Sequence, residues 1–232
     1  STSSCSRSIS QGSTLASRTL SQRTMVSMVH LAVWAAPTLL AAHRASAELI
    51  RGISYGPPPL RSMDEGWMPQ DDWFCNEAVP LWGRSGRGDL RVMKQLGANM
   101  VRLYGNNPEN DHTNFLDEAL EEGISVAAGT SDYPYYQMGG NCMSTDMNCF
   151  TQIKPLYADN LRKGFLRPDG TYHPALKYMN ILNEPDLKVM SQGVEKMAKA
   201  LISALDAMLD AEMEAGVTGP LINFTATFSF AI

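Results

Sequence analysis

The sequence predicts an α/β fold in which strands and helices alternate along the chain. Three features predict it: short apolar runs, amphipathic segments between those runs, and glycines where the amphipathic segments end. Such alternation implies parallel strands joined by right-handed crossovers. Both a (β/α) barrel and an open doubly wound sheet remain open. No glycine-rich phosphate loop follows the first strand, which argues against dinucleotide binding.

The first part of this alternation contains three strands and two helices. The predicted strands are 49–56, 98–105 and 124–131. A loop rich in Gly, Pro and Trp follows the first strand and leads into a helix at 88–97, where Leu90, Met93 and Leu96 recur at helical spacing. A second helix is predicted at 110–123, with inward positions Phe115, Leu116, Ala119 and Leu120.

The second part adds two helices and two strands. A helix near Thr151–Phe165 precedes a fourth strand at 176–182, and a long helix at 193–216 precedes a fifth strand at 220–232. The apolar stripe predicted for the long helix is Val194, Met197, Leu201, Leu205, Met208 and Leu209. An eightfold barrel needs about 250 residues. Because the chain also stops inside an apolar strand, we expect an N-terminal fragment of about five β/α units.

The first residues differ in composition from the rest. Residues 1–24 form a Ser/Thr-rich leader that we expect to be disordered, and no Asp or Glu occurs before Glu48. Residues 25–47 are typical of a signal peptide, because their apolar middle is short and Ala45-Ser46-Ala47 is a small-residue cleavage pattern. A buried helix is the alternative. We expect the folded domain at 48–232 in a secreted or cell-surface protein; a bipartite plastid leader is the other interpretation.

Composition limits the partners and cofactors. The chain is 44% hydrophobic and 19% charged with a net charge of −5, so nucleic acid is not an expected partner. No segment after residue 47 is expected to span a membrane. Cys142 and Cys149 are spaced to close a small disulfide loop, which leaves Cys75 free or paired outside this chain. The cysteine spacing matches no zinc pattern, and we expect neither a metal nor a cofactor.

Polar residues follow the predicted strands where those strands end. Asn183 and Glu184 come directly after the fourth strand, and Pro185 ends its ladder by withholding a donor. Catalytic groups of parallel α/β folds gather at the carboxyl ends of strands. Candidate substrate-binding residues at these ends are Asn183, Arg102, Tyr104, Asp132 and Tyr133.

Two segments carry a resemblance to a known family. NILNEPD, residues 180–186, resembles the acid/base signature of the retaining (β/α)8 glycoside hydrolases of the cellulase-like clan. DLRVMKQLGANMVRLYGNNPENDHTNFLDEALEEGISV, residues 89–126, resembles the region from the second to the third strand of β-1,3-glucanosyltransferases and β-1,3-glucanases. The resemblance extends over Leu49–Ile232 and implies a TIM barrel acting on a polysaccharide or oligosaccharide.

The resemblance implies a role for three of these residues. Glu184 would be the general acid/base, which protonates the leaving oxygen and then deprotonates water or an acceptor sugar. Asn183 would bind the sugar 2-hydroxyl, and Arg102 would orient the nucleophilic carboxylate. The family's nucleophile is a glutamate at the end of strand seven, which has no counterpart here, so we expect this chain alone to be inactive.

The expected function is therefore that of a glycosidase or transglycosylase acting on a β-linked glucan, with β-1,3 favoured, by a retaining mechanism. Two alternatives stay open. One is a non-catalytic carbohydrate-binding or wall-associated protein on a degenerate barrel. The other is an unrelated (β/α) enzyme in which Glu184 binds a metal; a structural ion pair remains the alternative for Arg102.

Several aromatic residues and histidines have two interpretations. Trp67, Trp73 and Trp82 either stack on sugar rings or pin their loop to the core. The tyrosines of 133–136 either line a cleft or pack. We expect His112 to be solvated in the first turn of its helix.

Overall fold

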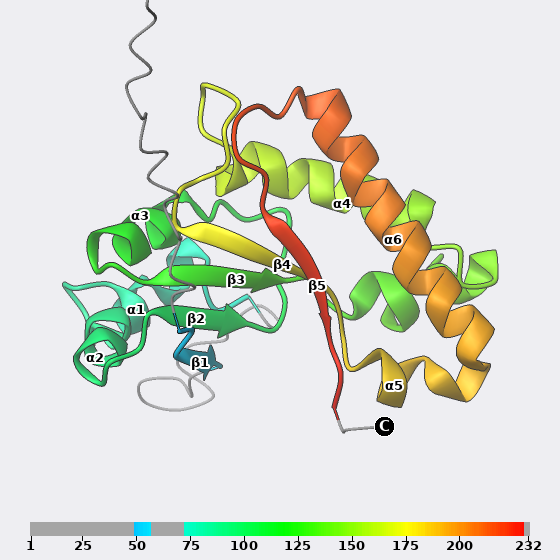
Figure 1. The fold of residues 1–232 in the computed structure, drawn as a ribbon, viewed down its shortest axis with the longest axis horizontal. Coiled ribbons are helices and arrows are strands. Elements are labelled where there is room, and N and C mark those ends of the chain that lie inside the picture. Colours follow the sequence, from blue (N-terminus) through cyan, green and yellow to red (C-terminus); the bar gives the residue numbers. More distant parts are fainter. Residues whose placement is uncertain (1–48, 57–71, 230–232) are drawn as a thin grey trace, which may run out of the picture. The chain divides into compact units, whose positions relative to one another are not determined.

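The computed structural model describes residues 49–56 and 72–229, which lie within one compact unit, Ala47–Ile232. Its centre is a five-stranded sheet in the order β1-β2-β3-β4-β5, with every neighbouring pair parallel (Figure 1). The strands are β1 Gly52–Tyr55, β2 Met100–Leu103, β3 Ser125–Gly129, β4 Leu176–Asn183 and β5 Asn223–Thr227. The predicted α/β class is confirmed. A doubly wound sheet needs a reversal of strand order, and these five strands follow the chain order without one.

Helices connect the strands as the alternation predicted. They are α1 Val79–Trp82, α2 Asp89–Gln95, α3 Thr113–Glu121, α4 Phe150–Asn160, α5 Pro185–Lys188 and α6 Val194–Ala215. The helix predicted near 151–165 is α4 followed by a π-helical turn at Leu161–Phe165. No helix in the described ranges is long and apolar enough to cross a membrane. The leader, the signal-peptide interpretation and Trp67 lie outside the described residues.

The two faces of the sheet have different surroundings. Successive residues of a strand point to opposite faces. One row across the sheet is buried against helices and consists of Tyr55, Leu103, Ala128, Met179 and Phe224, with only Phe224 partly exposed. We call its side the covered face. The neighbouring row is exposed or partly exposed and consists of Ser54, Arg102, Ala127, Tyr178 and Asn223. We call its side the open face.

Helix α6 buries a different stripe from the predicted one. Its buried residues are Ala200, Ala204, Ala207, Met208, Ala211 and Glu212. Of the predicted stripe, Met208 is buried and Met197, Leu201 and Leu205 are partly buried, whereas Val194 and Leu209 are exposed. Four alanines on one face let α4 and α6 approach closely, and the two helices lie side by side in Figure 1. Leu120 of α3 is also exposed, while its predicted neighbours Phe115, Leu116 and Ala119 are buried.

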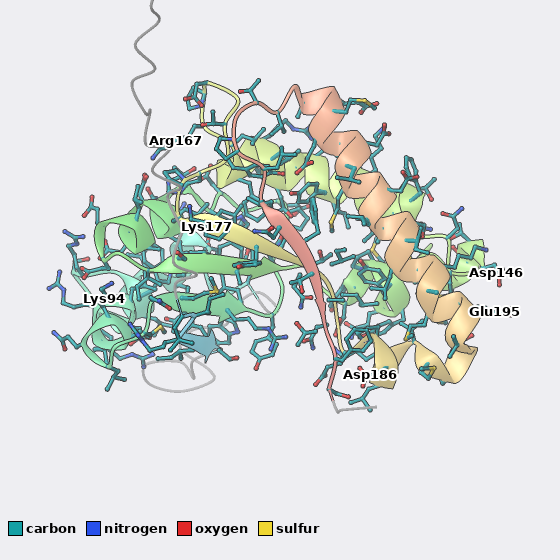
Figure 2. All side chains as sticks on the ribbon, in the orientation of Figure 1. Lys94, Asp146, Arg167, Lys177, Asp186 and Glu195 are labelled. Atoms are coloured by element: carbon teal, nitrogen blue, oxygen red, sulfur yellow. A yellow bond between two sulfur atoms is a disulfide. The ribbon has the colours of Figure 1, made fainter. Side chains whose placement is uncertain are left out.

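A disulfide joins Cys142 and Cys149 just before α4, as the spacing predicted. Asp146, inside this loop, forms ion pairs with Lys196 at 2.9 Å and Lys199 at 3.1 Å on α6. Figure 2 labels Asp146 beside that helix. The disulfide therefore closes this loop on itself, and the two lysine pairs fasten it to α6. Cys75 is buried and unpaired with any cysteine in the described part of the chain.

Candidate active site at the carboxyl ends of the strands

A cluster of three side chains joins β2 to the end of β4. The Arg102 guanidinium donates through Nη2 to Oδ1 of Asn183, and Nδ2 of Asn183 donates to Oε2 of Glu184 at 3.3 Å. We call these residues the strand-end cluster. The Glu184 side chain is 37% exposed, so the carboxylate remains accessible to a ligand. Asn183 thus lies between the arginine and the carboxylate that the sequence singled out.

The local backbone explains why Arg102 reaches Asn183. Strand β3 lies between β2 and β4, and neighbouring strands are about 4.8 Å apart. The β3 residue opposite Arg102 is Ala127, and the β3 residue opposite Asn180 is Gly129. These small residues leave the surface above β3 free, so the long arginine side chain can cross it.

A β-bulge turns Asn183 toward the cluster. Asn180 pairs with Thr225 and Asn183 pairs with Thr227, so three steps along β4 match two along β5. Without this extra residue the period of two would aim Asn183 at the covered face. The hydroxyl of Tyr135 donates to the carbonyl oxygen of Ile181 within the bulge at 2.6 Å. Burial raises the pKa of Tyr135, which keeps this hydroxyl protonated as a donor.

Glu184 itself adopts an uncommon backbone conformation. Its φ is 55° and its ψ is 52°, in the left-handed region that costs a residue with a Cβ about 1–2 kcal/mol. Its N–H donates to the carbonyl oxygen of Thr227 at 2.6 Å, and Pro185 follows as the first residue of α5. Strain of this kind is common at functional sites, where the surrounding structure holds it.

A lysine connects Glu184 to the loop after β3. Nζ of Lys188 forms an ion pair with Asp132 Oδ2 and lies 4.0 Å from Glu184 Oε2. The structure thus brings Asp132 near Glu184 through a residue that the sequence analysis did not identify. The sequence does indicate the proximity of Lys188 to Glu184, because a lysine four residues after a glutamate lies on the same side of a helical turn.

The two candidate tyrosines lie in different surroundings. The guanidinium of Arg102 lies 4.7 Å from the ring centroid of Tyr104, in a cation–π contact at the strand-end cluster. Tyr133 instead lines a separate cavity beside α4. Within the described ranges it forms no side-chain hydrogen bond or ion pair with Arg102, Asn183 or Glu184.

Several polar atoms near the strand ends are buried and lack a hydrogen-bond partner among the described residues. They are Arg102 Nε, Asp132 Oδ1, Thr130 Oγ1, and Nδ2 and Oδ1 of Asn180. An unpartnered buried polar group costs about 1–3 kcal/mol. Asn180 is only 3% exposed, although it belongs to the open face. This concentration of unpartnered groups is typical of a site that a further polar partner completes.

Helix α5 is tied to the segment that follows the last strand. Asp186, labelled in Figure 2, accepts hydrogen bonds from the backbone N–H of Ser229 at 3.1 Å and from its hydroxyl at 2.5 Å. Together with the bond from Glu184 N–H to Thr227, these contacts fix the position of Glu184 against β5. They also give Asp186, the last residue of the NILNEPD segment, a structural role.

His112 is buried, and the expectation of a solvated histidine is wrong. Its Nε2 lies 3.1 Å from both carboxylate oxygens of Asp72, and the side chains of both residues are fully buried. The His112 ring stacks on Phe74 with the ring centroids 4.0 Å apart. Asp72 also accepts from Asn110 and from the backbone N–H of Asn107. The pair fastens the loop after β2. A contact between residues 40 positions apart leaves no local pattern that sequence reasoning could use.

Trp82 is also structural. It is buried and packs edge-on against Phe115 at 5.3 Å, which favours the interpretation that it pins its loop to the core.

The donor set of the site does not favour a metal. No group of three or more His, Cys, Asp and Glu residues in the described part of the chain could hold one.

No protein-family model matches this chain, and a comparison with curated proteins finds no similar sequence.

Proposed function

We propose that the protein is a glycoside hydrolase or transglycosylase acting on a β-linked glucan, with β-1,3 linkages favoured. The observation that carries the proposal is the strand-end cluster, in which Arg102, Asn183 and an accessible Glu184 are linked by hydrogen bonds. An amide that both donates and accepts, next to a carboxylate, suits a polyhydroxylated ligand.

The proposed fold is a (β/α)8 barrel of which this sheet is a part. Parallel sheets are almost always covered on both faces, yet the row from Ser54 to Asn223 is exposed or partly exposed. In a barrel that face would be the interior, which further β/α units would enclose. The sequential strand order and the polar groups on the open face support this proposal.

In the proposed mechanism Glu184 is the general acid/base. It would protonate the glycosidic oxygen as the bond to the sugar breaks, and then accept a proton from water or from an acceptor sugar. Asn183 would hydrogen-bond the 2-hydroxyl of the sugar, and this hydrogen bond would strengthen in the transition state. A bulge held by Tyr135 aims Asn183, so its position is set before a ligand binds.

A retaining mechanism needs a second carboxyl group about 5–5.5 Å from the first. Asp132 is already paired with Lys188 in an ion pair. We therefore do not assign Asp132 the role of nucleophile. The resemblance implies a glutamate at the end of a seventh strand, where Arg102 Nε would be available to orient it. On this proposal the 232 residues alone do not turn over glucan.

The rival function is non-catalytic carbohydrate binding. The pairing of Asp132 with Lys188 favours it, because that ion pair occupies the carboxylate that Lys188 brings near Glu184.

The experiment measures cleavage of laminarin by the full gene product and by its Glu184→Gln variant. Asp206→Asn, at an exposed carboxylate on α6, is the matched control. We expect Glu184→Gln to lower kcat/KM by about 10²–10⁴-fold, the usual contribution of a general acid/base, and the control to match wild type. Equal turnover in both variants would overturn the assignment; binding without turnover in the wild type would favour the rival.

A further inference from the structure

A cavity of about 300 Å³ lies beside the strand-end cluster but does not include it. The loop after β2, the loop after β3 and helix α4 form its walls, and Arg102, Asn183 and Glu184 are absent from its lining. Ligand pockets in proteins run from about 300 to 1,000 Å³. This volume therefore suits a small molecule of one ring and excludes a long segment of polymer.

The floor of the cavity is apolar and rigid. It consists of Ile153 and Tyr157 of α4 and Met208 of α6, which are all buried in the core. The Tyr157 hydroxyl is engaged with the hydroxyl of Tyr172 at 2.7 Å, so Tyr157 offers the cavity its ring and not its polar end. An aromatic surface of this kind packs against the C–H face of a ligand ring.

Among the described residues, the rim of the cavity is polar and carries no cationic side chain. Its hydrogen-bonding groups are the amides of Asn106, Asn107 and Asn160 and the hydroxyls of Thr130, Ser131 and Tyr133. Glu109 is the one charged residue in this described lining. With a carboxylate and no lysine, arginine or histidine in that lining, the cavity disfavours an anionic ligand. Amides and hydroxyls suit a neutral ligand with several hydroxyl groups.

Thr130 supplies a second, independent indication of a ligand. This residue is only 8% exposed and lines the cavity, yet its hydroxyl has no hydrogen-bond partner among the described residues. Its backbone N–H is already bound to the carbonyl oxygen of Asn180 at 2.9 Å, so the backbone fixes the position of the residue. A buried hydroxyl held in place without a partner is what a binding site offers to a ligand.

Hydrogen bonds within the chain fix the walls of the cavity relative to one another. Asn160 of α4 donates to Oδ1 of Asn106 at 2.7 Å, and Asn106 donates to the carbonyl oxygen of Gly129 at 2.7 Å. A Cβ on Gly129 would lie 2.3 Å from the backbone oxygen of Tyr104, so glycine allows the loop after β2 to cross the end of β3. The cavity is thus formed before a ligand enters.

We propose that this cavity binds one neutral pyranose ring, as a carbohydrate site separate from the strand-end cluster. The apolar floor would receive the C–H face of the ring, and the rim would bind its hydroxyls. This inference does not depend on the catalytic role of Glu184.

The experiment titrates the 232-residue chain with methyl β-D-glucopyranoside and follows backbone amide NMR shifts. We expect saturable shifts in residues that line the cavity. Thr130→Val should weaken binding by about tenfold, which corresponds to one lost hydrogen bond. Because the hydroxyl has no partner among the described residues, the same variant should keep the unfolding free energy of the wild type or raise it.

Leu156→Trp tests the volume of the cavity, since Leu156 lines it and is partly buried. We expect it to abolish saturable binding, whereas Val92→Trp on the exposed side of α2 and Glu184→Gln should bind as the wild type does. D-glucuronate, which carries a carboxylate, should bind at least about tenfold more weakly than the neutral glucoside.

Three results would overturn the proposal: no saturable binding to the wild type, unchanged binding in Thr130→Val, or binding lost in Glu184→Gln. The last would place the sugar at the strand-end cluster. If Leu156→Trp does not fold, Thr130→Val alone decides. Loss of glucan cleavage in Glu184→Gln with intact binding at the cavity separates this site from the proposed active site.

Discussion

Two neighbouring rows of residues cross the same sheet and differ in almost every respect. The row of Tyr55, Leu103, Ala128, Met179 and Phe224 is apolar, except for the hydroxyl of Tyr55, and packs under helices. The row of Ser54, Arg102, Ala127, Tyr178 and Asn223, one residue earlier on each strand, is more polar and partly or fully exposed. The covered face supplies the packing that stabilises the sheet, and the open face holds the candidate chemistry.

Buried polar atoms without a partner are more frequent around the open face and the strand ends, although Nδ1 of buried His112 also lacks one among the described residues. On the covered side, buried Glu212 accepts a hydrogen bond from Tyr172, which also bonds to Tyr157. On the open side, Asn180 and Arg102 keep buried polar atoms without a partner among the described residues. A site for a polar ligand retains such groups at a cost in stability, because the ligand needs them.

The largest expected effect is on the covered face. Met179→Ala removes a fully buried side chain and should lower the unfolding free energy by about 2–5 kcal/mol, the usual cost of a large-to-small change in a core. Thr225→Ala, at an exposed position on β5, is the matched control and should change it by less than about 0.5 kcal/mol. Urea denaturation measures both. Equal losses would show that the two faces do not differ as described.

A second substitution should raise stability. Asn180→Leu introduces an apolar side chain of similar shape in place of an amide whose two polar atoms lack partners in the described part of the chain. We expect the unfolding free energy of this chain to rise by about 1 kcal/mol, since the desolvation cost of the amide disappears. A loss of similar size in urea denaturation would mean that the amide of Asn180 is satisfied after all.

A smaller, pH-dependent effect is expected at Glu212. Burial raises the pKa of this carboxyl from its ordinary value of 4.5. The folded state therefore binds the proton more tightly than the unfolded state, so this contribution to stability is complete below pH 4.5 and is lost as pH rises through the raised pKa. Each unit by which the pKa is raised is worth about 1.4 kcal/mol.

Glu212→Gln tests this sign, because glutamine keeps an acceptor for Tyr172 and cannot ionise. Relative to the wild type, the variant should gain stability as pH increases above 4.5. Unfolding free energies across the pH range measure the difference. A constant difference would indicate that Glu212 titrates normally.

Much of the fold followed from local patterns. Four predicted strands contain an observed one, and β4 runs one residue beyond the predicted fourth strand, to Asn183. The Cys142–Cys149 disulfide and the place of Glu184 at the end of β4 also agree with the structure. These features depend on residues close together in sequence, where periodicity and spacing act directly.

Features that depend on distant contacts could not be predicted. The bulge that turns Asn183 arises from pairing with β5 and from Tyr135, 46 positions from Ile181. The alanine seam of α6 was missed because a stripe of long apolar side chains dominates a hydrophobicity pattern, whereas close helix packing selects small ones. The pairing of Lys188 with Asp132, 56 positions away, could not be predicted either, although the spacing of Lys188 from Glu184 was visible in the sequence.

The most direct test is the rate of laminarin cleavage by the full gene product carrying Asn183→Ala, with the folded fraction measured on the same sample. Asn183 is the residue that the bulge moves to the open face and that joins Arg102 to Glu184. We predict a drop of about 100-fold or more in kcat/KM with the folded fraction unchanged, as for loss of one group that stabilises a transition state. Wild-type turnover, or a loss that only follows unfolding, would contradict the account.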